Sequence, residues 1–290
     1  MARGGSNQGV VDFGRGLLET GDLAPVYVAL HGMVVGGKVD AGTQLKRWLV
    51  AYWCFYHCGA ASYLSEFEGR DFWRSMAQAA ANEVAAPTGG RWPRGAERRH
   101  FRGAASVRAV RALSESYDSG EEMFNYVVGP WSAAAKPFAE VAGRARENPL
   151  FGPWISFKVC DMVERLGYQP VDFDEAAVFM FKDPARAADM VWEQYVGPLS
   201  KSKVPELERR HRVVERLCRE FEDYRAPPRG DRAVNIQEVE TVLCKWKSHR
   251  NGHYPLGKDI REIRHGLSEW ADRCQTAFEM RSHMPPEVEA

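Results

Sequence analysis

Carboxylate, ammonium and aromatic side chains are concentrated in one segment, Asn148 to Glu175, which reads NPLFGPWISFKVCDMVERLGYQPVDFDE. A Gly-Pro turn precedes a predicted helix over 154–166, and Asp172 follows a second turn. Lys158 and Asp161 stand three residues apart on that helix, a spacing at which a solvated ion pair is usual. Asp172 can take part in proton transfer, or it can only cap a following helix by accepting hydrogen bonds from free N–H groups.

Basic side chains gather earlier in the chain, where seven Arg between Arg91 and Arg111 face a single acid, Glu97, with His100 among them. This imbalance favours an anionic partner over a routinely paired surface. The whole chain has 39 basic and 39 acidic residues, so the domain-wide basic surface typical of nucleic-acid binding is absent. Lys258 and Arg261 lie at a predicted helix start, where a second anion site is expected.

Apolar residues recur at helical spacing along most of the chain and strand patterns are scarce, which predicts an all-α fold. A strongly buried helix is expected over 41–67, ended by Gly69. Further helices are predicted over 71–82, 103–117, 119–128, 131–147, 154–166, 173–181, 184–196, 204–224, 235–249 and 259–280. We expect a main helical domain over 1–225 and a C-terminal helical segment over 226–290 that packs on it. The Pro-rich segment Ala226–Gly230 is the candidate linker.

The sequence also argues against several classes of protein. No apolar run reaches the roughly 18 to 20 residues of a membrane span, and no secretion signal precedes the first helix, so a cytoplasmic protein is expected. Six scattered cysteines favour reduced thiols. The groups Cys54, His57, Cys58 and Cys244, His249, His253 do not match known zinc patterns. There is no Walker loop and no dinucleotide fingerprint, and we expect neither metal nor cofactor.

The 148–175 segment resembles the core of helix-hairpin-helix DNA glycosylases, where a Leu-Pro-Gly-type hairpin opens a Lys-bearing helix and a Val-Asp-Thr-His element with a catalytic Asp follows. Leu150-Phe151-Gly152 is similar to the hairpin, with Gly152 at the DNA-binding position. Lys158 is similar to the helix lysine and Val171-Asp172-Phe173-Asp174 to the Asp element. The chain departs from this pattern because the second hairpin glycine is missing, Pro153 lacks an N–H, and Lys158 lies about two positions late. It also lacks a C-terminal four-cysteine iron-sulfur pattern.

A second resemblance covers most of the chain. The stretches YHCGAASYLSEFEG (56–69), GAERRHFRG (95–103), GPWISFK with the following CD (152–161), PVDFD (170–174) and YPLGKDIREI (254–263) occur in this order. Together they resemble the phage alpha-glutamyl/putrescinyl thymine pyrophosphorylases, also called amino acid:DNA transferases. The resemblance implies double-stranded DNA as partner and hydroxymethyluracil, pyrophosphorylated on its exocyclic oxygen, as the reacting base. Pyrophosphate is replaced by the amine of an amino acid or polyamine, and the glycosidic bond survives.

The implied reaction assigns roles to particular residues. The base must leave the duplex and stack on aromatic side chains; the departing pyrophosphate needs cations; and the attacking amine must lose a proton. The candidates are Trp154 and Phe157 for stacking, Arg98, Arg99, His100 and Arg102 with Lys258 and Arg261 for pyrophosphate, and Asp172 as base, with Asp174 in reserve and Lys158 and Asp161 as further catalytic residues. Glu66 and Glu68 either recognise an amine or are surface acids.

Two other functions fit the same residues. A base-excising glycosylase would use the Asp element to stabilise a sugar cation. A non-catalytic DNA-binding module would need only the arginines. If the family resemblance holds, the protein works in the cytoplasm of a phage-infected bacterium.

Overall fold

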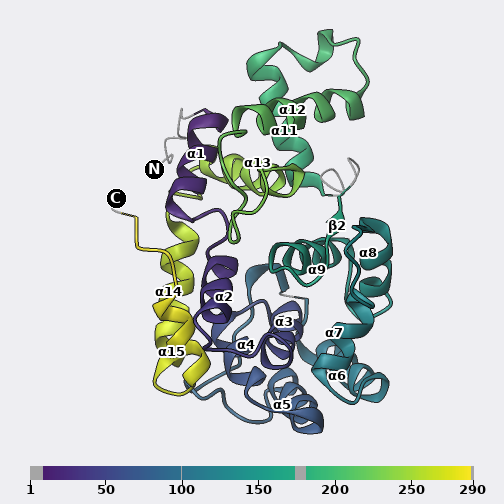
Figure 1. Ribbon diagram of the computed structural model, residues 1–290, viewed down its shortest axis with the longest axis vertical. Helices are drawn as coiled ribbons and strands as arrows, with labels where there is room; N and C mark the ends of the chain where they lie inside the picture. The colour runs from purple at the N-terminus through teal and green to yellow at the C-terminus, as the bar shows by residue number, and fades with distance from the viewer. Residues whose placement is uncertain (1–8, 99, 174–180, 289–290) are drawn as a thin grey trace. The chain divides into compact units, whose positions relative to one another are not determined.

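A computed structural model describes residues 9–98, 100–173 and 181–288, and in this part of the chain the fold is all-α, as predicted (Figure 1). Its helices and strands are α1 Val10–Thr20, α2 Pro25–Val35, α3 Gln44–Phe55, α4 Cys58–Ser65, α5 Gly69–Ala81, the 3-10 turn η1 Ala96–Arg98, α6 Gly103–Ser116, α7 Gly120–Val128, β1 Lys136–Pro137, α8 Phe138–Arg146, α9 Pro153–Arg165, β2 Val171–Asp172, α11 Lys182–Tyr195, η2 Leu199–Lys201, α12 Glu206–Glu220, α13 Ile236–Arg250, α14 Lys258–Ala271 and α15 Gln275–Ser282. The relation to the glycosylase fold stays a prediction.

The chain divides into two compact units, each assembled from distant segments. Unit 1 contains the described residues of 1–25, 172–261 and 285–290, and unit 2 contains 26–171 and 262–284. Residues on both sides of the boundary expected at 225/226 therefore belong to unit 1. Within it, the 226–230 segment forms a turn closed by the bridge between Arg225 and Ala233.

Unit 1 is built on α1, α11, α12 and α13, with α13 packed against the other three. Their apolar faces meet around Phe13, Trp192, Phe221 and Trp246, which are at most 6% exposed. Helix α13 begins with a complete capping box. The Asn235 side chain accepts a hydrogen bond from a backbone N–H of the first turn, and the Glu238 carboxylate accepts one from the Asn235 N–H. These local signals explain why the predicted helix over 235–249 matches α13 to within one residue.

Unit 2 holds a larger aromatic core. Its fully buried members include Trp48, Trp53, Phe72, Phe124 and Trp270. Helix α3 packs on both α4 and α7, α5 packs on α6, and α8 packs on α9. Strand β1 pairs with β2, at which this unit's segment 26–171 ends, and the Lys136 N–H donates to the carbonyl of Pro170 at 2.9 Å. Among the described residues, no helix is both long enough and apolar enough to cross a membrane.

The buried helix expected over 41–67 is interrupted after Phe55, and this break shapes the site described below. Tyr56 adopts the left-handed conformation with φ 51°, and a new helix, α4, starts at Cys58. Gly95 approaches so closely that a Cβ there would lie 2.4 Å from the Tyr56 carbonyl oxygen. The Gly95 N–H donates to the Phe55 carbonyl at 3.0 Å. The break thus frees helix carbonyls to hold the 95–98 segment.

Other observed helix boundaries also differ from the predicted ones. Gly69, expected to end a helix, has φ 48° and begins α5. The helix expected over 131–147 starts only at Phe138, because Lys136 and Gln169 bind the preceding loop. The helix expected over 259–280 is divided between α14 and α15. Helices α1 and α2 lie in a region where no helix was predicted, and most of the helix expected over 173–181 falls outside the described residues.

The start of α4 carries a testable pH dependence. The Nδ1 atom of His57 accepts the Ala60 N–H at 3.2 Å, and burial lowers the pKa of His57 to about 4. The unfolded chain, with a histidine pKa near 6.5, then binds the extra proton as pH falls from about 6.5 towards 4, so stability is lost in that window. We expect the free energy of unfolding to drop between pH 7 and 4.5 by about 2 kcal/mol more in the wild type than in His57→Asn, whose amide caps without titrating.

Urea denaturation at the two pH values measures this difference. The exposed His265 provides the matched control, and His265→Asn should follow the wild type. Equal pH dependence in the wild type and His57→Asn would show that His57 does not stay neutral in the folded protein.

Candidate functional site

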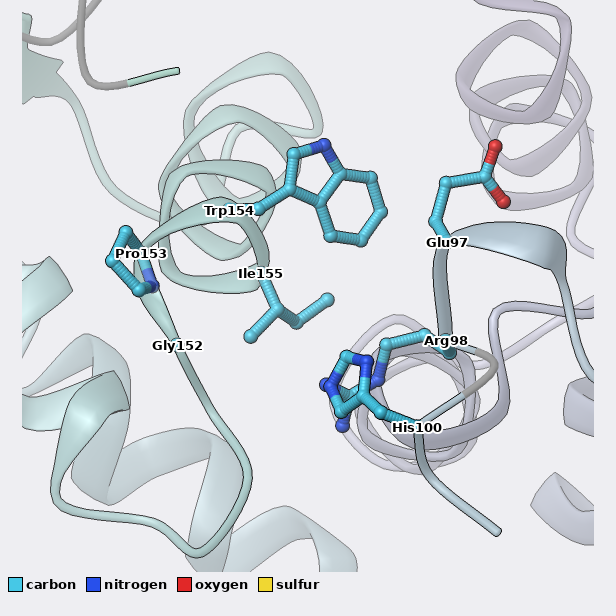
Figure 2. Close-up of a pocket in the computed structure, with 7 residues that line it drawn as sticks. All are labelled: Glu97, Arg98, His100, Gly152, Pro153, Trp154 and Ile155. Atoms are coloured by element: carbon cyan, nitrogen blue, oxygen red, sulfur yellow. The ribbon is translucent and has the colours of Figure 1, made fainter. Parts of the chain in front are cut away.

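A cavity of about 370 Å³ in unit 2 brings together four of the residues singled out in the sequence (Figure 2). They are Arg98, His100, Gly152 and Trp154, and the lining is completed by Glu97, Pro153 and Ile155. One wall is the turn η1 and the loop after it, and the other is the start of α9. The arginine-rich segment and the hairpin-like segment, about fifty residues apart in the chain, therefore form one site.

Arg98 is the most constrained of these side chains, being fully buried at 0% exposure. Its Nε donates to the Cys54 carbonyl at 3.2 Å, and its Nη1 donates to the Leu150 carbonyl at 2.8 Å. The first carbonyl is freed by the break after α3, and the second belongs to a residue in the left-handed conformation, with φ 65°. The rings of Phe101 and Phe151 lie 4.9 and 5.4 Å from the guanidinium carbon. The site thus positions Arg98 by backbone and aromatic contacts.

The remaining nitrogen of Arg98, Nη2, is buried and has no hydrogen-bond partner among the described residues. Among the described residues no carboxylate pairs with this guanidinium, and burial lowers the pKa of Arg98. Arginine nevertheless stays protonated in proteins, so a full positive charge is held in the interior. Burying a charge without a counter-ion is costly, and an anionic ligand that enters the cavity would offset that cost.

His100 and Glu97 set the charge around Arg98. Nη1 of Arg98 lies 3.0 Å from Nε2 of His100, and because arginine can only donate, that ring nitrogen must accept. Burial, and then the charge of Arg98, lower the pKa of His100, which favours the same neutral ring. Glu97 is exposed, and Figure 2 shows its carboxylate pointing away from Arg98, whereas the guanidinium of Arg98 lies beside His100.

The two aromatic candidates have different environments. Trp154 is partly buried at the cavity wall, and its ring meets that of Tyr56 edge to face at 4.9 Å. Phe157 is only 1% exposed and packs against Phe138 with ring centres 6.0 Å apart. Phe157 is therefore a core residue outside this cavity, and only Trp154 remains available there for stacking.

Lys158 and Asp161 form a buried network, so the expectation of a solvated ion pair is wrong. Their side chains are 13% and 1% exposed, with Lys158 Nζ 4.0 Å from Asp161 Oδ2. Asp161 also accepts from the Tyr27 hydroxyl at 2.7 Å and lies 3.8 Å from Arg165. Burial and the nearby charge of Asp161 raise the pKa of Tyr27. The network ties α9 to α2, and none of its members lines the cavity.

Asp172 occupies the end of β2 and is exposed. It belongs to unit 1, whereas the cavity belongs to unit 2. Its reserve, Asp174, and the residues that Asp172 would cap lie outside the described residues. The catalytic and capping roles of Asp172 both remain predictions.

The second anion site, expected at the start of α14, is already occupied by the protein's own carboxylate. Asp22 is 0% exposed and accepts the N–H groups of Gly257 at 2.7 Å and Ile260 at 3.1 Å. Lys258 donates to the His253 carbonyl, and Arg261 donates to the Leu256 carbonyl. The N–H groups of Gly257 and Ile260 are thus satisfied internally, which leaves fewer donors for an external phosphate. Pyrophosphate binding by Lys258 and Arg261 stays a prediction.

The other polar candidates divide into structural and available groups. Glu66 accepts from the Thr276 N–H at 3.1 Å and holds the start of α15, and Glu68, whose side chain is 80% exposed, lies 3.5 Å from Arg47. Recognition of an amine by either residue stays a prediction. Arg102 is exposed beside the first turn of α6, and Arg99 lies outside the described residues. In the described part of the chain, no group of three His, Cys, Asp or Glu residues is arranged to hold a metal ion.

Two residues that the sequence did not single out as site residues are notable in the structure. Glu97 lines the cavity, and its only signal was being the single acid in the arginine run. Trp131 is 69% exposed on a loop held by Gln169, which accepts from the Ser132 N–H at 2.8 Å. An exposed tryptophan on a fixed loop could be recognised only once its burial was known.

Comparisons with known proteins give a consistent result. Residues 19–253 match the family model described as amino acid:DNA transferase. A glycinyltransferase of Pseudomonas phage PaMx11 is 49% identical over 298 aligned positions, which cover 98% of this chain and 99% of that protein. A putrescinyltransferase of Delftia phage PhiW-14 is 25% identical, over 96% of this chain and 83% of that protein.

Proposed function

Because the chain belongs to the amino acid:DNA transferase family, we propose that it joins glycine, through its amine, to pyrophosphorylated hydroxymethyluracil in double-stranded DNA. Membership makes the protein a transferase of DNA base hypermodification. The observation that carries the choice of glycine is the 49% identity to a glycinyltransferase along nearly the whole chain. The cytoplasm of a phage-infected bacterium is the proposed place of action.

The proposed reaction is a displacement at the exocyclic carbon of the base. The amine nitrogen forms a bond to that carbon, the carbon–oxygen bond breaks, and its electron pair leaves with pyrophosphate. The incoming ammonium loses one proton before attack, and the attached nitrogen loses a second one afterwards. Asp172 is proposed as the acceptor of the first proton, since an exposed carboxylate can reach a substrate.

The remaining roles follow from burial and charge. Trp154 is proposed to stack on the extruded base at the cavity wall. The exposed Arg102, together with Arg99, is proposed to meet the departing pyrophosphate. Arg98 and His100 remain predicted anion-binding residues, and the charge of their cavity decides which anion they hold. Lys158 and Asp161 are proposed to position α9, because their network is internal.

Nucleoside analysis tests the proposed reaction. Duplex DNA carrying the pyrophosphorylated base is incubated with the protein and an equimolar mixture of glycine, glutamate and putrescine. We expect glycinyl-methyluracil as the main modified nucleoside in mass spectra, with one pyrophosphate released for each base modified. A product carrying putrescine or glutamate instead would contradict the choice of glycine.

The same reaction mixture separates the rival functions. A base-excising glycosylase would leave abasic sites and free base, whereas transfer leaves the glycosidic bond intact. A non-catalytic DNA-binding module would retain the DNA without releasing pyrophosphate. Either outcome would contradict the proposal.

A further inference from the structure

The cavity of unit 2 is lined by the buried guanidinium of Arg98. No carboxylate pairs with this guanidinium among the described residues. Arg98 is fully buried, and its Nη2 has no hydrogen-bond partner in the described part of the chain. Its other two nitrogens are satisfied by the Cys54 and Leu150 carbonyls, so the guanidinium is fixed in place before any ligand arrives. A fixed guanidinium with one unpartnered nitrogen is suited to a planar carboxylate, which reaches the buried Nη2 when a neighbouring side chain moves aside.

The same cavity contains a negative charge in a different position. Glu97 precedes Arg98 in the turn η1, and the two side chains diverge, so that the guanidinium lies beside His100 and the Glu97 carboxylate points away from both (Figure 2). The carboxylate of Glu97 is exposed and is available to an ammonium group that enters the cavity. The lining therefore offers one group of each sign.

The balance of charge decides between the anions considered for this cavity. Pyrophosphate carries several negative charges near neutral pH, and it would meet a single guanidinium, a histidine ring that acts as an acceptor towards Arg98, and an acid. Like-charge contact with Glu97 disfavours it. An α-amino acid carries one charge of each sign, so that its carboxylate can pair with Arg98 and its ammonium with Glu97.

Size and polarity agree with a small amino acid. The volume of about 370 Å³ accommodates glycine with room for water. The rest of the lining, Gly152, Pro153, Trp154 and Ile155, has no charged side chain.

We propose that this cavity is the binding site of the amino-acid co-substrate, with the carboxylate on Arg98 and the ammonium facing Glu97. The inference rests on the proposed function, from which it takes glycine as ligand. It assigns Arg98 and His100 to the incoming amino acid instead of to pyrophosphate. It also gives a physical basis for choosing an amino acid over a diamine, because a diamine has nothing to place on Arg98.

Calorimetric titration of the full-length protein without DNA tests the site independently of transfer. The ligands are glycine, methylamine, acetate and pyrophosphate, so that each charge of glycine is removed in turn. We expect glycine to bind at least about tenfold more tightly than methylamine or acetate, the loss typical of one charge-assisted hydrogen bond. Equal binding of glycine and methylamine would overturn the proposal, as would pyrophosphate binding that Arg98→Gln abolishes and Glu97→Gln strengthens.

Two variants assign the contacts. Arg98→Gln should abolish glycine binding, but this buried position can affect folding, so the exposed Glu97→Gln carries the decision. We expect Glu97→Gln to weaken glycine binding about tenfold and to leave acetate binding unchanged. Glu115→Gln, an exposed acid on α6, is the matched control and should bind like the wild type. Unchanged glycine affinity in Glu97→Gln would overturn the site.

Transfer assays keep this inference distinct from the proposed function. If glycine binds as expected but no glycinyl base forms, the proposed reaction fails while the site stands. If glycine is transferred, and Glu97→Gln changes neither its KM nor its preference over methylamine, the site fails while the reaction stands.

Discussion

Asp172→Asn is expected to lower the rate of amine transfer by at least about a hundredfold, the scale on which a positioned general base contributes. The substitution preserves the shape of the side chain but removes its ability to take a proton from the incoming ammonium. DNA binding should persist, since one exposed carboxylate contributes nothing favourable to the contact with phosphates. Single-turnover release of pyrophosphate measures the rate, and a filter-binding assay measures DNA retention.

Asp118→Asn is the matched control for this experiment. Asp118 is an exposed acid that forms a surface ion pair with Arg70 at 3.6 Å, and its replacement should leave the rate unchanged. A normal rate in Asp172→Asn, combined with lower thermal stability, would instead make Asp172 a helix cap. A rate restored by raising the pH would support the proton-transfer role, because the amine then arrives already deprotonated.

The second large effect is expected on stability, at Asp22. Its buried carboxylate accepts from the Gly257 and Ile260 N–H groups and from the Tyr254 hydroxyl at 3.2 Å. Asp22→Ala leaves the two buried N–H groups without an acceptor, and each costs about 1–3 kcal/mol when unsatisfied, whereas the Tyr254 hydroxyl can still bond to Asp259. We expect the free energy of unfolding to fall by roughly 3 kcal/mol or more in urea denaturation.

Two further variants define the origin of that loss. Asp22→Asn keeps one acceptor oxygen and should lose clearly less than Asp22→Ala. Ser119→Ala removes an exposed cap, whose hydroxyl accepts the Glu122 N–H at 3.1 Å, and should cost only about 1 kcal/mol. If Asp22→Ala were no more harmful than Ser119→Ala, the start of α14 would have another acceptor, such as water or an external anion.

The fold could be predicted from sequence where its signals are local. Helices α7, α9 and α13 begin beside Ser119, Pro153 and Asn235, residue types that mark helix starts on their own. The breaks at Tyr56 and before Cys274 could not be predicted, because their causes lie far away in the chain. Gly95 binds at the first break, and Glu66 holds the second, 208 residues from its partner Cys274.

The same distinction applies to the candidate site. The arginine imbalance and the hairpin-like segment identified Arg98, His100, Gly152 and Trp154 from residue type and spacing. Their meeting in one cavity depends on the Cys54 and Leu150 carbonyls, contacts over 44 and 52 residues that no local pattern contains. Periodicity also could not show that Phe157 is in the core, since both faces of α9 are buried.

The C-terminal helices have a consequence for biosynthesis. Trp270 of α14 is fully buried against Gly59, where a Cβ would come within 2.2 Å of its ring, and α15 packs on α4. Residues 26–171 leave the ribosome long before residues 262–284, which complete the same unit. The nascent chain therefore presents the uncovered Gly59 face of α4 while residues 172–261 are still being translated. Unit 2 can close only after its last helix has emerged.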